Sequence, residues 1–253
     1  MNADGRAVLV TGASRGIGAA IARAFARDGD RVAVHFGRSG GRAEEVAAGL
    51  EGSGHVVVGG DLTDPDAVRA MVDAAAEGLG GIDVLVNNAG VFTPHPISET
   101  TYEEWQAGWR ETLGVNLVGA ANVTWCAVAH MLRGGRAGRI VNVASRGAFR
   151  GEPGQPAYGA SKAGIIAFGQ SLARDLGPKG IVVTAVAPGF TETDMARDEL
   201  TGARGEARRA ESPLGRVATA DEVAAAVVFL ASPQAEMASG AVLDVNGASY
   251  LRM

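Results

Sequence analysis

The chain has 253 residues, of which 47% are hydrophobic and 20% are charged, as is usual for a globular protein with a substantial core. The formal net charge of −5 argues against a nucleic-acid-binding role, which would need a basic face. A single cysteine, Cys126, excludes an intramolecular disulfide and is typical of a cytoplasmic protein. The sequence shows no apolar run of about 18 residues for a membrane span, no signal-peptide pattern and no metal-ligand spacing among its histidines. We therefore expect a cytoplasmic protein without a metal site.

The first apolar run, Ala7–Val10, leads into the glycine-rich stretch Thr11-Gly12-Ala13-Ser14-Arg15-Gly16-Ile17-Gly18. This pattern predicts a buried parallel strand, a tight turn and a helix from about Ile17 to Arg27. Glycines let the backbone approach a pyrophosphate, and the free N–H groups of a helix N-terminus favour an anion there. A glycine turn alone can also be a plain strand–helix connection. Its place at the start of an alternating strand–helix chain favours a dinucleotide site.

The second predicted strand, Arg31–Phe36, should end close to the adenosine ribose. NAD-binding proteins usually place an Asp or Glu there, whereas here no acidic residue occurs between Arg31 and Ala43. Cations and a hydroxyl surround this position instead, and they are Arg15, Arg38, Ser39 and Arg42. Such groups suit a 2′-phosphate, so the sequence favours NADP(H) over NAD(H). Arg42 could also be a solvated residue of the short helix predicted over residues 42–50.

The third strand, His55–Val58, is followed at its carboxyl end by Asp61-Leu62. Ligands bind at this edge of open α/β sheets, so Asp61 could accept a hydrogen bond from an adenine amino group. It could instead cap the helix that begins at Pro65, although Asp64 is better placed for that role.

The fourth strand, Asp83–Val86, ends in Asn87-Asn88-Ala89-Gly90, where small residues permit backbone contact with a cofactor. For the two asparagines we favour a structural role between neighbouring strands. Residues 102–131 predict a long helix interrupted near Gly114. Asn116 lies inside it, which is unfavourable unless the amide bonds backbone or water.

The fifth strand, Arg139–Ala144, delivers Ser145, and a Gly/Pro-rich loop over residues 147–156 leads to Tyr158 and Lys162. Residues four apart on a helix share a face, so a lysine ammonium should lower the tyrosine pKa from its usual value of about 10. The tyrosine would then be a proton donor or acceptor near neutral pH. The Ser145 and Tyr158 hydroxyls could bond one carbonyl oxygen. A chance pair on a solvated helix is the alternative.

The sixth strand, Ile181–Ala187, stops at Pro188-Gly189, and residues 190–216 are polar without a strand pattern. That segment has the size of a mobile lid over a substrate, or it is an ordinary pair of surface helices. A helix over residues 220–231 and a seventh strand over 241–245 complete the pattern. We predict one α/β domain over residues 1–253. It is a single-domain Rossmann fold, a doubly wound seven-stranded parallel sheet with helices on both faces.

Taken together, the glycine turn, Asn87–Gly90, Asn116, Ser145, Tyr158-x-x-x-Lys162 and Pro188-Gly189 occur in family order and spacing. The whole chain thereby resembles the short-chain dehydrogenase/reductase family. Within it, residues 188–195 and 243–247 are most similar to the 3-oxoacyl-(acyl-carrier-protein) reductases.

The resemblance implies reduction of a ketone with Tyr158 as general acid and Ser145 polarising the carbonyl oxygen. It also implies that Lys162 bonds the nicotinamide ribose and that Asn116 positions a water linked to Lys162. The cofactor contacts that it implies, together with those inferred above, are Gly12, Ser14, Arg15, Gly16, Ile17, Gly18, Arg38, Ser39, Asp61, Leu62, Asn88, Ala89, Gly90, Tyr158, Lys162, Pro188, Gly189, Thr191 and Thr193. Thr191 departs from the aliphatic residue that is more frequent in the family.

The substrate stays open between a 3-oxoacyl thioester, free ketones, sugars and polyketide-like molecules. Arg136 and Lys179 could contact an acidic acyl carrier protein or be solubilising charges. Two other hypotheses are an NAD-dependent secondary-alcohol dehydrogenase acting oxidatively on a sugar, steroid or other small molecule, and a nucleotide-binding scaffold without activity. An acidic residue near Phe36 would have favoured the NAD-dependent dehydrogenase. Loss of Ser145, Tyr158 or Lys162 would have favoured the scaffold without activity. Two long helices that are apolar on more than one face predict a homotetramer.

Overall fold

The fold is built around one parallel β-sheet, seen in a computed structural model that describes residues 5–135, 137–193, 196 and 198–252. Its strands follow the order β3-β2-β1-β4-β5-β6-β7, and every pairing is parallel. Their bounds are β1 Ala7–Val10, β2 Arg31–Phe36, β3 Val56–Gly59, β4 Val84–Asn87, β5 Gly138–Val143, β6 Ile181–Pro188 and β7 Val242–Val245. The order reverses between β1 and β4, which opens a crevice at the carboxyl ends of these strands. The predicted Rossmann fold is confirmed.

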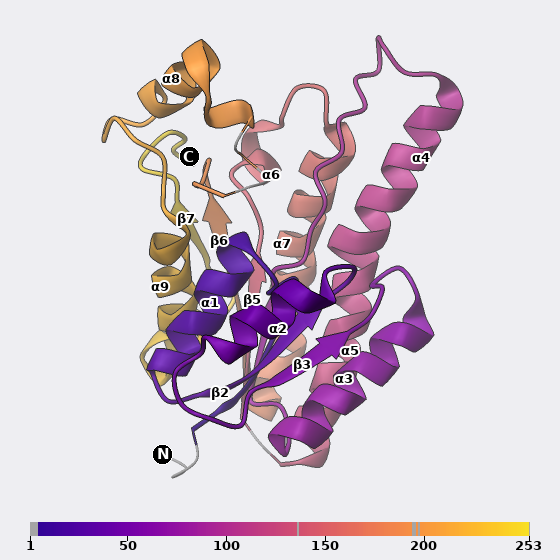
Figure 1. Cartoon of the computed structure of the whole chain (residues 1–253), viewed down its shortest axis with the longest axis vertical. Helices are drawn as coiled ribbons and strands as arrows, with labels where there is room; N and C mark the ends of the chain where they lie inside the picture. Colours follow the sequence, from indigo (N-terminus) through magenta and orange to yellow (C-terminus); the bar gives the residue numbers. More distant parts are fainter. Residues whose placement is uncertain (1–4, 136, 194–195, 197, 253) are drawn as a thin grey trace.

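Helices cover both faces of the sheet (Figure 1). They are α1 Gly16–Arg27, α2 Gly40–Ala48, α3 Pro65–Leu79, α4 Tyr102–Leu113, α5 Ala120–Arg133, α6 Gly147–Arg150, α7 Pro156–Leu176, α8 Gly202–Ala210 and α9 Ala220–Leu230. Two of them begin as the sequence predicts: Asp64 accepts from the Asp66 and Ala67 amides at the start of α3, and Thr219 forms a capping box at α9.

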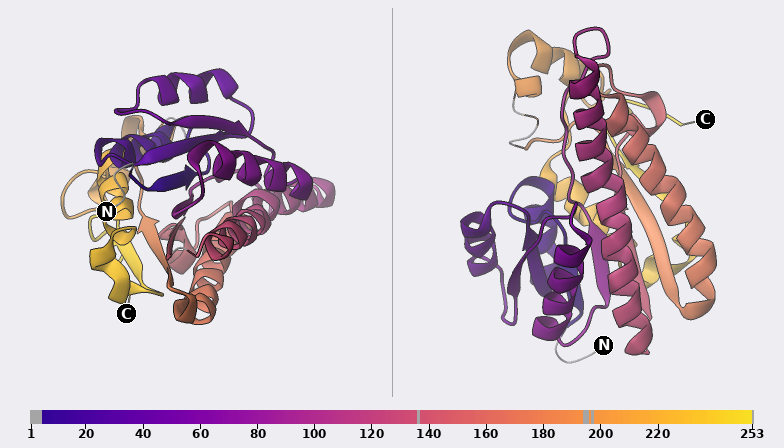
Figure 2. Two further views of the ribbon diagram at one scale, coloured as in Figure 1. Left: turned by 90° about the horizontal axis from the view of Figure 1, so that it is seen from below. Right: turned by 90° about the vertical axis from the view of Figure 1, so that its right-hand side faces the viewer.

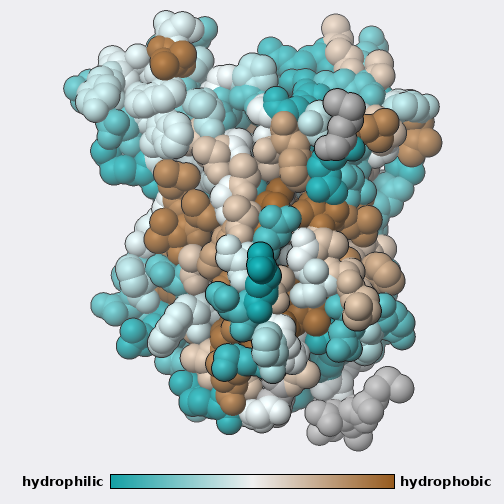
Figure 3. Space-filling view, turned by 180° about the vertical axis from the view of Figure 1, so that it is seen from behind, coloured by the Kyte–Doolittle hydropathy of each residue, from teal (hydrophilic) through white to brown (hydrophobic). Residues whose placement is uncertain are grey.

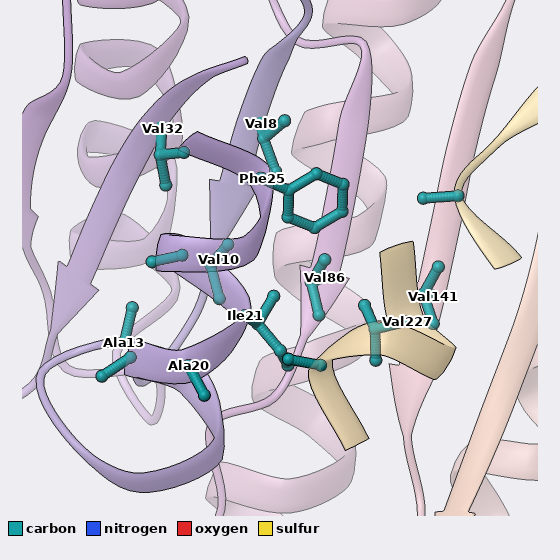
Figure 4. Close-up of a cluster of buried hydrophobic side chains, with 14 of the residues drawn as sticks. Val8, Val10, Ala13, Ala20, Ile21, Phe25, Val32, Val86, Val141 and Val227 are labelled. Carbon is teal, nitrogen blue, oxygen red and sulfur yellow. The ribbon is translucent and has the colours of Figure 1, made fainter. Parts of the chain in front are cut away.

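Strand β1 shows how the two faces are separated. Val8 and Val10 point into a cluster with Phe25 and Val227 from α1 and α9 (Figure 4). Ala7 and Leu9 belong to the opposite cluster, which contains α3 and α5 side chains. Alternate residues of a strand face opposite sides of the sheet, so an all-apolar run is expected where both faces are covered.

Helices α4 and α5 run as one long element beside α7 (Figure 2), joined by a π-helical turn over Gly114–Gly119. This turn lies where the sequence predicts an interruption. By length and composition alone, the stretch Tyr102–Arg133 could cross a membrane. However, 44% of its apolar part is buried inside the fold, and α5 packs against α3. Burial in the core accounts for part of its apolar character, while Trp125 stays exposed.

The Gly/Pro-rich loop before α7 contains more helix than the sequence suggests, because it includes α6. The polar segment after β6 includes α8 and a short 3-10 turn at Asp198–Leu200, as the surface-helix alternative for this segment anticipates. Thr191 also forms an isolated parallel bridge with Ala218, which ties the base of the polar segment to the chain that leads into α9.

Candidate active site

A cavity of about 750 Å³ lies at the carboxyl ends of the central strands. Its wall contains every residue that the sequence assigns to cofactor binding, from the glycine turn to Thr193, and it also contains Ser145. Residues from seven separate segments therefore meet at the edge where open α/β sheets bind ligands. Among the predicted site residues only Asn116 is absent from this wall.

The glycine turn is fixed by short polar side chains. The Thr11 hydroxyl accepts from the Asn88 and Ala89 amides at 3.0 and 3.1 Å, and Asn88 Nδ2 donates to Thr11 O at 2.9 Å. Gly12 has φ of +64°, and a Cβ there would lie 2.8 Å from Ala89 Cα. Glycine is therefore required both by the backbone conformation and by the closeness of the β4 loop.

A residue that sequence reasoning missed, His35, also holds this turn. Its ring is buried, with Nδ1 accepting from the Gly12 amide at 3.0 Å and Nε2 lying 3.0 Å from Gly60 O. Because a carbonyl oxygen only accepts, Nε2 carries the hydrogen and the ring is neutral. Burial lowers the pKa of His35, which favours the same neutral form. The strand pattern gave no signal for this role, because it depends on two loops distant in sequence.

Arg15, Arg38 and Ser39 lie at one end of the cavity wall. Within the described residues, neither guanidinium takes part in an ion pair, so both are free to meet an anion. Asp61 lies nearby, and hydrogen bonds from the Thr63 amide and hydroxyl hold its pKa below the usual range. Arg42 lines a neighbouring notch with Arg15 rather than the cavity itself.

Asn87 has the structural role expected for it. Its Nδ2 donates to Asn142 Oδ1 at 2.9 Å, linking β4 to β5, and to Thr124 Oγ1 at 2.8 Å. The departure at Thr191 is also accommodated structurally. Its side chain is buried, and its hydroxyl donates to Gly189 O at 3.2 Å within the turn.

The hydroxyl and ammonium groups of the candidate catalytic set lie between β5 and α7. Lys162 Nζ donates to Val143 O at 2.8 Å and lies 5.7 Å from the centre of the Tyr158 ring. The edge of the Tyr158 ring meets Phe92 at a centroid distance of 4.8 Å. Ser145 Oγ accepts from the Gly147 amide at 3.0 Å, which leaves its own hydrogen free to donate.

The prediction that Lys162 lowers the Tyr158 pKa is wrong for this structure. Burial raises the pKa of Tyr158, a hydrogen bond with the Ser145 side chain offsets part of the rise, and the Glu152 carboxylate adds to it. Burial also lowers the pKa of Lys162, to about 8. The spacing of the two residues on the helix was right, but burial dominates both pKa values, and Lys162 is not among the groups that shift the Tyr158 pKa.

Asn116 lies behind the cavity wall, in the π-helical turn. Its Oδ1 accepts from the Val91 amide at 2.8 Å, while Nδ2 donates to Val91 O at 3.0 Å and to Ser161 Oγ at 3.2 Å. The amide thus bonds backbone, as its placement inside a helix suggested. Ser161 in turn donates to Tyr158 O, so Asn116 connects the β4 loop to the catalytic helix.

A cluster of charged residues around Phe190 adjoins the cavity wall, to which Arg146 and Phe190 belong, and sequence reasoning missed it. Arg146, next to Ser145, is only 2% exposed and pairs with Glu211 Oε2 at 2.7 Å. Arg150 and Arg208 bind the same carboxylate at 3.2 and 2.8 Å. Phe190 lies between Arg146 and Arg208, 5.0 and 4.5 Å from their guanidinium carbons. Local sequence carries no signal for this cluster, because its members meet only in three dimensions.

Comparison with known proteins agrees with this geometry. Residues 12–248 match the family model described as "Enoyl-(Acyl carrier protein) reductase". The chain is 38% identical over 252 residues to the 3-oxoacyl-(acyl-carrier-protein) reductase FabG of Vibrio cholerae, covering 99% of the chain and 100% of that protein. The Escherichia coli K12 protein of the same name is 37% identical over the same coverage. The chain belongs to the short-chain dehydrogenase/reductase family.

Solved structures of family members superpose closely on the chain. A short-chain dehydrogenase from Burkholderia cenocepacia in complex with NADP has a TM-score of 0.87 and 41% identity, over 97% of this chain and 98% of that one. A 3-ketoacyl-(acyl-carrier-protein) reductase from Brucella melitensis complexed with NADH has a TM-score of 0.88 and 33% identity, over 98% and 99%. Membership of the family makes this chain an NAD(P)-dependent oxidoreductase acting on carbonyl or hydroxyl groups.

Proposed function

We propose that the protein uses NADPH to reduce a ketone, as a 3-oxoacyl thioester or a related carbonyl, to a secondary alcohol. The observation that carries this proposal is the meeting of Ser145, Tyr158 and Lys162 at the wall of a cavity that also contains two arginines with no ion pair among the described residues. The named relatives support the substrate class, and the NADP complex of the Burkholderia protein supports the cofactor.

The residues present fit such a dinucleotide. The turn at Gly12 and Gly16 has positive φ values and closes on the N-terminus of α1, where backbone N–H groups favour a pyrophosphate. Arg15 and Arg38 suit a 2′-phosphate because both line the cavity and neither forms an ion pair within the part of the chain that the structure describes. The Pro188-Gly189 turn and Thr193 would hold the nicotinamide end.

When bound, the nicotinamide supplies the hydride. Tyr158 donates its phenolic proton to the carbonyl oxygen, and the Ser145 hydroxyl donates a hydrogen bond to the same oxygen. Lys162 has a pKa of about 8 and is therefore mostly an ammonium at neutral pH, held by Val143 O and placed to bond the nicotinamide ribose. Asn116 keeps the β4 loop and the backbone of Tyr158 together, and we retain for it the role of positioning a water near Lys162.

The raised pKa of Tyr158 keeps it a phenol at neutral pH, the form from which it donates a proton in the proposed reduction. A phenol that stays protonated at neutral pH is ready to give a proton, whereas oxidation of an alcohol would need the phenolate. The rate of alcohol oxidation should therefore increase more than the rate of ketone reduction as the pH rises.

We further propose that residues 190–216 form a lid over the substrate. The segment contributes Phe190, Ala196 and Glu199 to the cavity wall, and α8 lies at the end of the molecule toward which β6 points (Figure 1). Its attachment to the catalytic loop runs mainly through Glu211, an arrangement that lets it move without disturbing the sheet.

An acyl carrier protein stays a proposed partner, but Lys179 does not support it. Lys179 follows the C-terminus of α7, a helix of 21 residues with Tyr158 at its start, and this places it about 30 Å away along the axis. Arg136, the other basic residue considered for this role, lies outside the described residues.

We also propose a homotetramer. Large apolar side chains are exposed on α5, α9 and the C-terminal region, including Trp125, Phe229 and Met237. Apolar patches cross the middle of the rear face of the molecule (Figure 3), and burial against a second copy would remove them from water. Light scattering at micromolar concentration checks this expectation, and a monomer would contradict it.

The test of the proposed function is a steady-state assay at pH 7 with two paired reactions. We expect NADPH to be consumed with a 3-oxoacyl thioester, and little NADH to form from NAD and secondary alcohols such as sugars or steroids. A higher kcat/KM for the NAD-dependent oxidation would overturn the proposal in favour of the dehydrogenase alternative.

A further inference from the structure

We propose that His95 is a positioning residue for Tyr158, capping the catalytic helix from the loop between β4 and α4. This inference rests on the proposed role of Tyr158 as proton donor. His95 is 1% exposed and is not part of the cavity wall, so it touches neither substrate nor cofactor. Its effect would pass through the backbone beneath the tyrosine.

Helix α7 begins without a cap of its own. Pro156, its first residue, has no N–H, and the preceding Gln155 makes no side-chain capping bond. The next amide, that of Ala157, has no carbonyl available one turn earlier and would be a buried orphan. His95 Nε2 accepts from it at 3.3 Å across 62 residues of sequence. The residue whose amide is held in this way is the immediate neighbour of Tyr158.

The orientation of the His95 ring is determined by its other nitrogen. Nδ1 lies 2.7 Å from Thr93 O, and because a carbonyl only accepts, Nδ1 carries the hydrogen. Nε2 is therefore the unprotonated nitrogen, which is the form needed to accept from Ala157. The His95 backbone amide adds a second tie to the same region by donating to Gly154 O at 2.8 Å.

Packing keeps the ring in place from the side of α4. Trp105 meets it in an edge-to-face contact with centroids 5.5 Å apart. Gly108 leaves just enough room, since a Cβ there would lie 3.0 Å from His95 Cγ. The same loop also carries Phe92, whose ring contacts Tyr158. Residues 92–95 therefore contact both the side chain of Tyr158 and the turn of helix that presents it.

The competing explanation is that buried His95 contributes to stability alone. Two substitutions distinguish this explanation from a positioning role. His95→Phe keeps an aromatic ring but removes the acceptor, whereas His95→Gln retains an oxygen that can accept from Ala157. Small errors in the placement of a reacting group are costly, so we expect His95→Phe to lower kcat about ten-fold or more. The NADPH Kd should change less than about two-fold, and His95→Gln should recover most of the rate.

The rate is normalised to the NADPH-binding sites found by titration, so that unfolded protein does not count. Wild-type kcat per site in His95→Phe, with only a lower Tm, would overturn the proposal in favour of a structural role. An equal loss of kcat in His95→Gln would also overturn it, because the acceptor would not be what matters.

A second variant and a second readout keep the test decisive. Gly108→Ala crowds the ring without changing its chemistry and should lower kcat per site in the same direction, while Gly177→Ala, at an open site after α7, should not. Amide hydrogen exchange at Ala157 and Tyr158 in the cofactor-free protein should be faster in His95→Phe. Unchanged exchange overturns the capping role, whereas failure of Tyr158 as proton donor would leave the exchange result intact.

Discussion

The two ends of the cavity are held together by different kinds of interaction. At the end that contains the glycine turn, the contacts are short neutral hydrogen bonds from Thr11, Asn88 and His35 to backbone groups. At the end where we propose that the substrate enters, the contacts are ion pairs centred on Glu211. The first set joins strands and loops of the sheet, while the second joins the segment after β5 to α8 and the residue that follows it.

Because of this difference, we expect the glycine-turn end of the cavity to be rigid and the Glu211 end to be able to move. A buried backbone group without a hydrogen-bond partner costs free energy. The glycine-turn end should therefore keep its structure in the free protein. The pairs of Glu211 with Arg150 and Arg208 are partly exposed and therefore screened by salt, so this end should open more easily than the glycine-turn end, although Arg146 is buried. A reductase that exchanges substrates needs both properties at once.

The largest expected effect tests the chemistry that lies between the two ends. Tyr158→Phe keeps the ring and removes only the hydroxyl, so turnover should fall by roughly 10²–10⁴ with NADPH affinity nearly unchanged. Lys162→Met should impair both turnover and NADPH binding, and the double variant should lose far less than the product of the two effects. Stopped-flow ketone reduction and fluorescence titration measure these quantities. Near-normal reduction by Tyr158→Phe would mean that the proton comes from another group.

The next effect concerns the rigid end. Removing Arg15 or Arg38 should cost roughly 1.5–3 kcal/mol of NADPH binding each, about a ten- to hundred-fold rise in Kd, while NADH affinity stays nearly constant. Arg42→Ala is the matched control, because it removes the same charge from the neighbouring notch. Equal affinities of the wild-type protein for NADPH and NADH would contradict the assignment.

A smaller effect is expected at the end of the cavity beside the Glu211 ion pairs. Burial acts to raise the pKa of Glu211, but Arg208, Arg146 and Arg150 hold it below the usual range, so the group is a carboxylate at neutral pH. Glu211→Gln should lower the free energy of unfolding by about 1–3 kcal/mol, because Arg146 is left buried without its nearest carboxylate. It should also raise KM several-fold and speed proteolytic cleavage of the lid.

Glu236→Gln provides the control for Glu211, since it removes a longer and more exposed ion pair with Arg139. If both variants change KM equally, the Glu211 contacts do not hold the lid. The wild-type KM should also rise with salt, and Glu211→Gln should lose most of that dependence.

The smallest expected effect concerns His35, which holds the glycine turn. Burial lowers its pKa below the ordinary value of 6.5, so below pH 6.5 the unfolded chain binds a proton that the native chain excludes. Stability should therefore fall as the pH decreases from 6.5 to the native pKa, by at most about 1.4 kcal/mol per pH unit. His35→Gln should flatten this slope in urea titrations of the cofactor-free protein. An unchanged slope would assign it to other groups.

The sequence was most informative where local spacing carries the constraint. The glycine turn and the Tyr158–Lys162 pair are such cases, since each depends on a few consecutive residues and the geometry of one helix. The pKa of Tyr158 could not be predicted in the same way, because burial depends on the whole fold. His35, His95 and the Glu211 cluster were missed for a related reason: each acts through partners that are distant in sequence.

The π-helical turn over Gly114–Gly119 has a consequence for how this fold can diversify. One additional residue in a helix rotates everything beyond it by roughly 100°. The face of α4 that brings Arg110 and Glu111 to the cavity is therefore set independently of the face that α5 buries against the sheet. Substitutions on α4 that suit another substrate therefore leave the packing of α5 against the sheet unaltered.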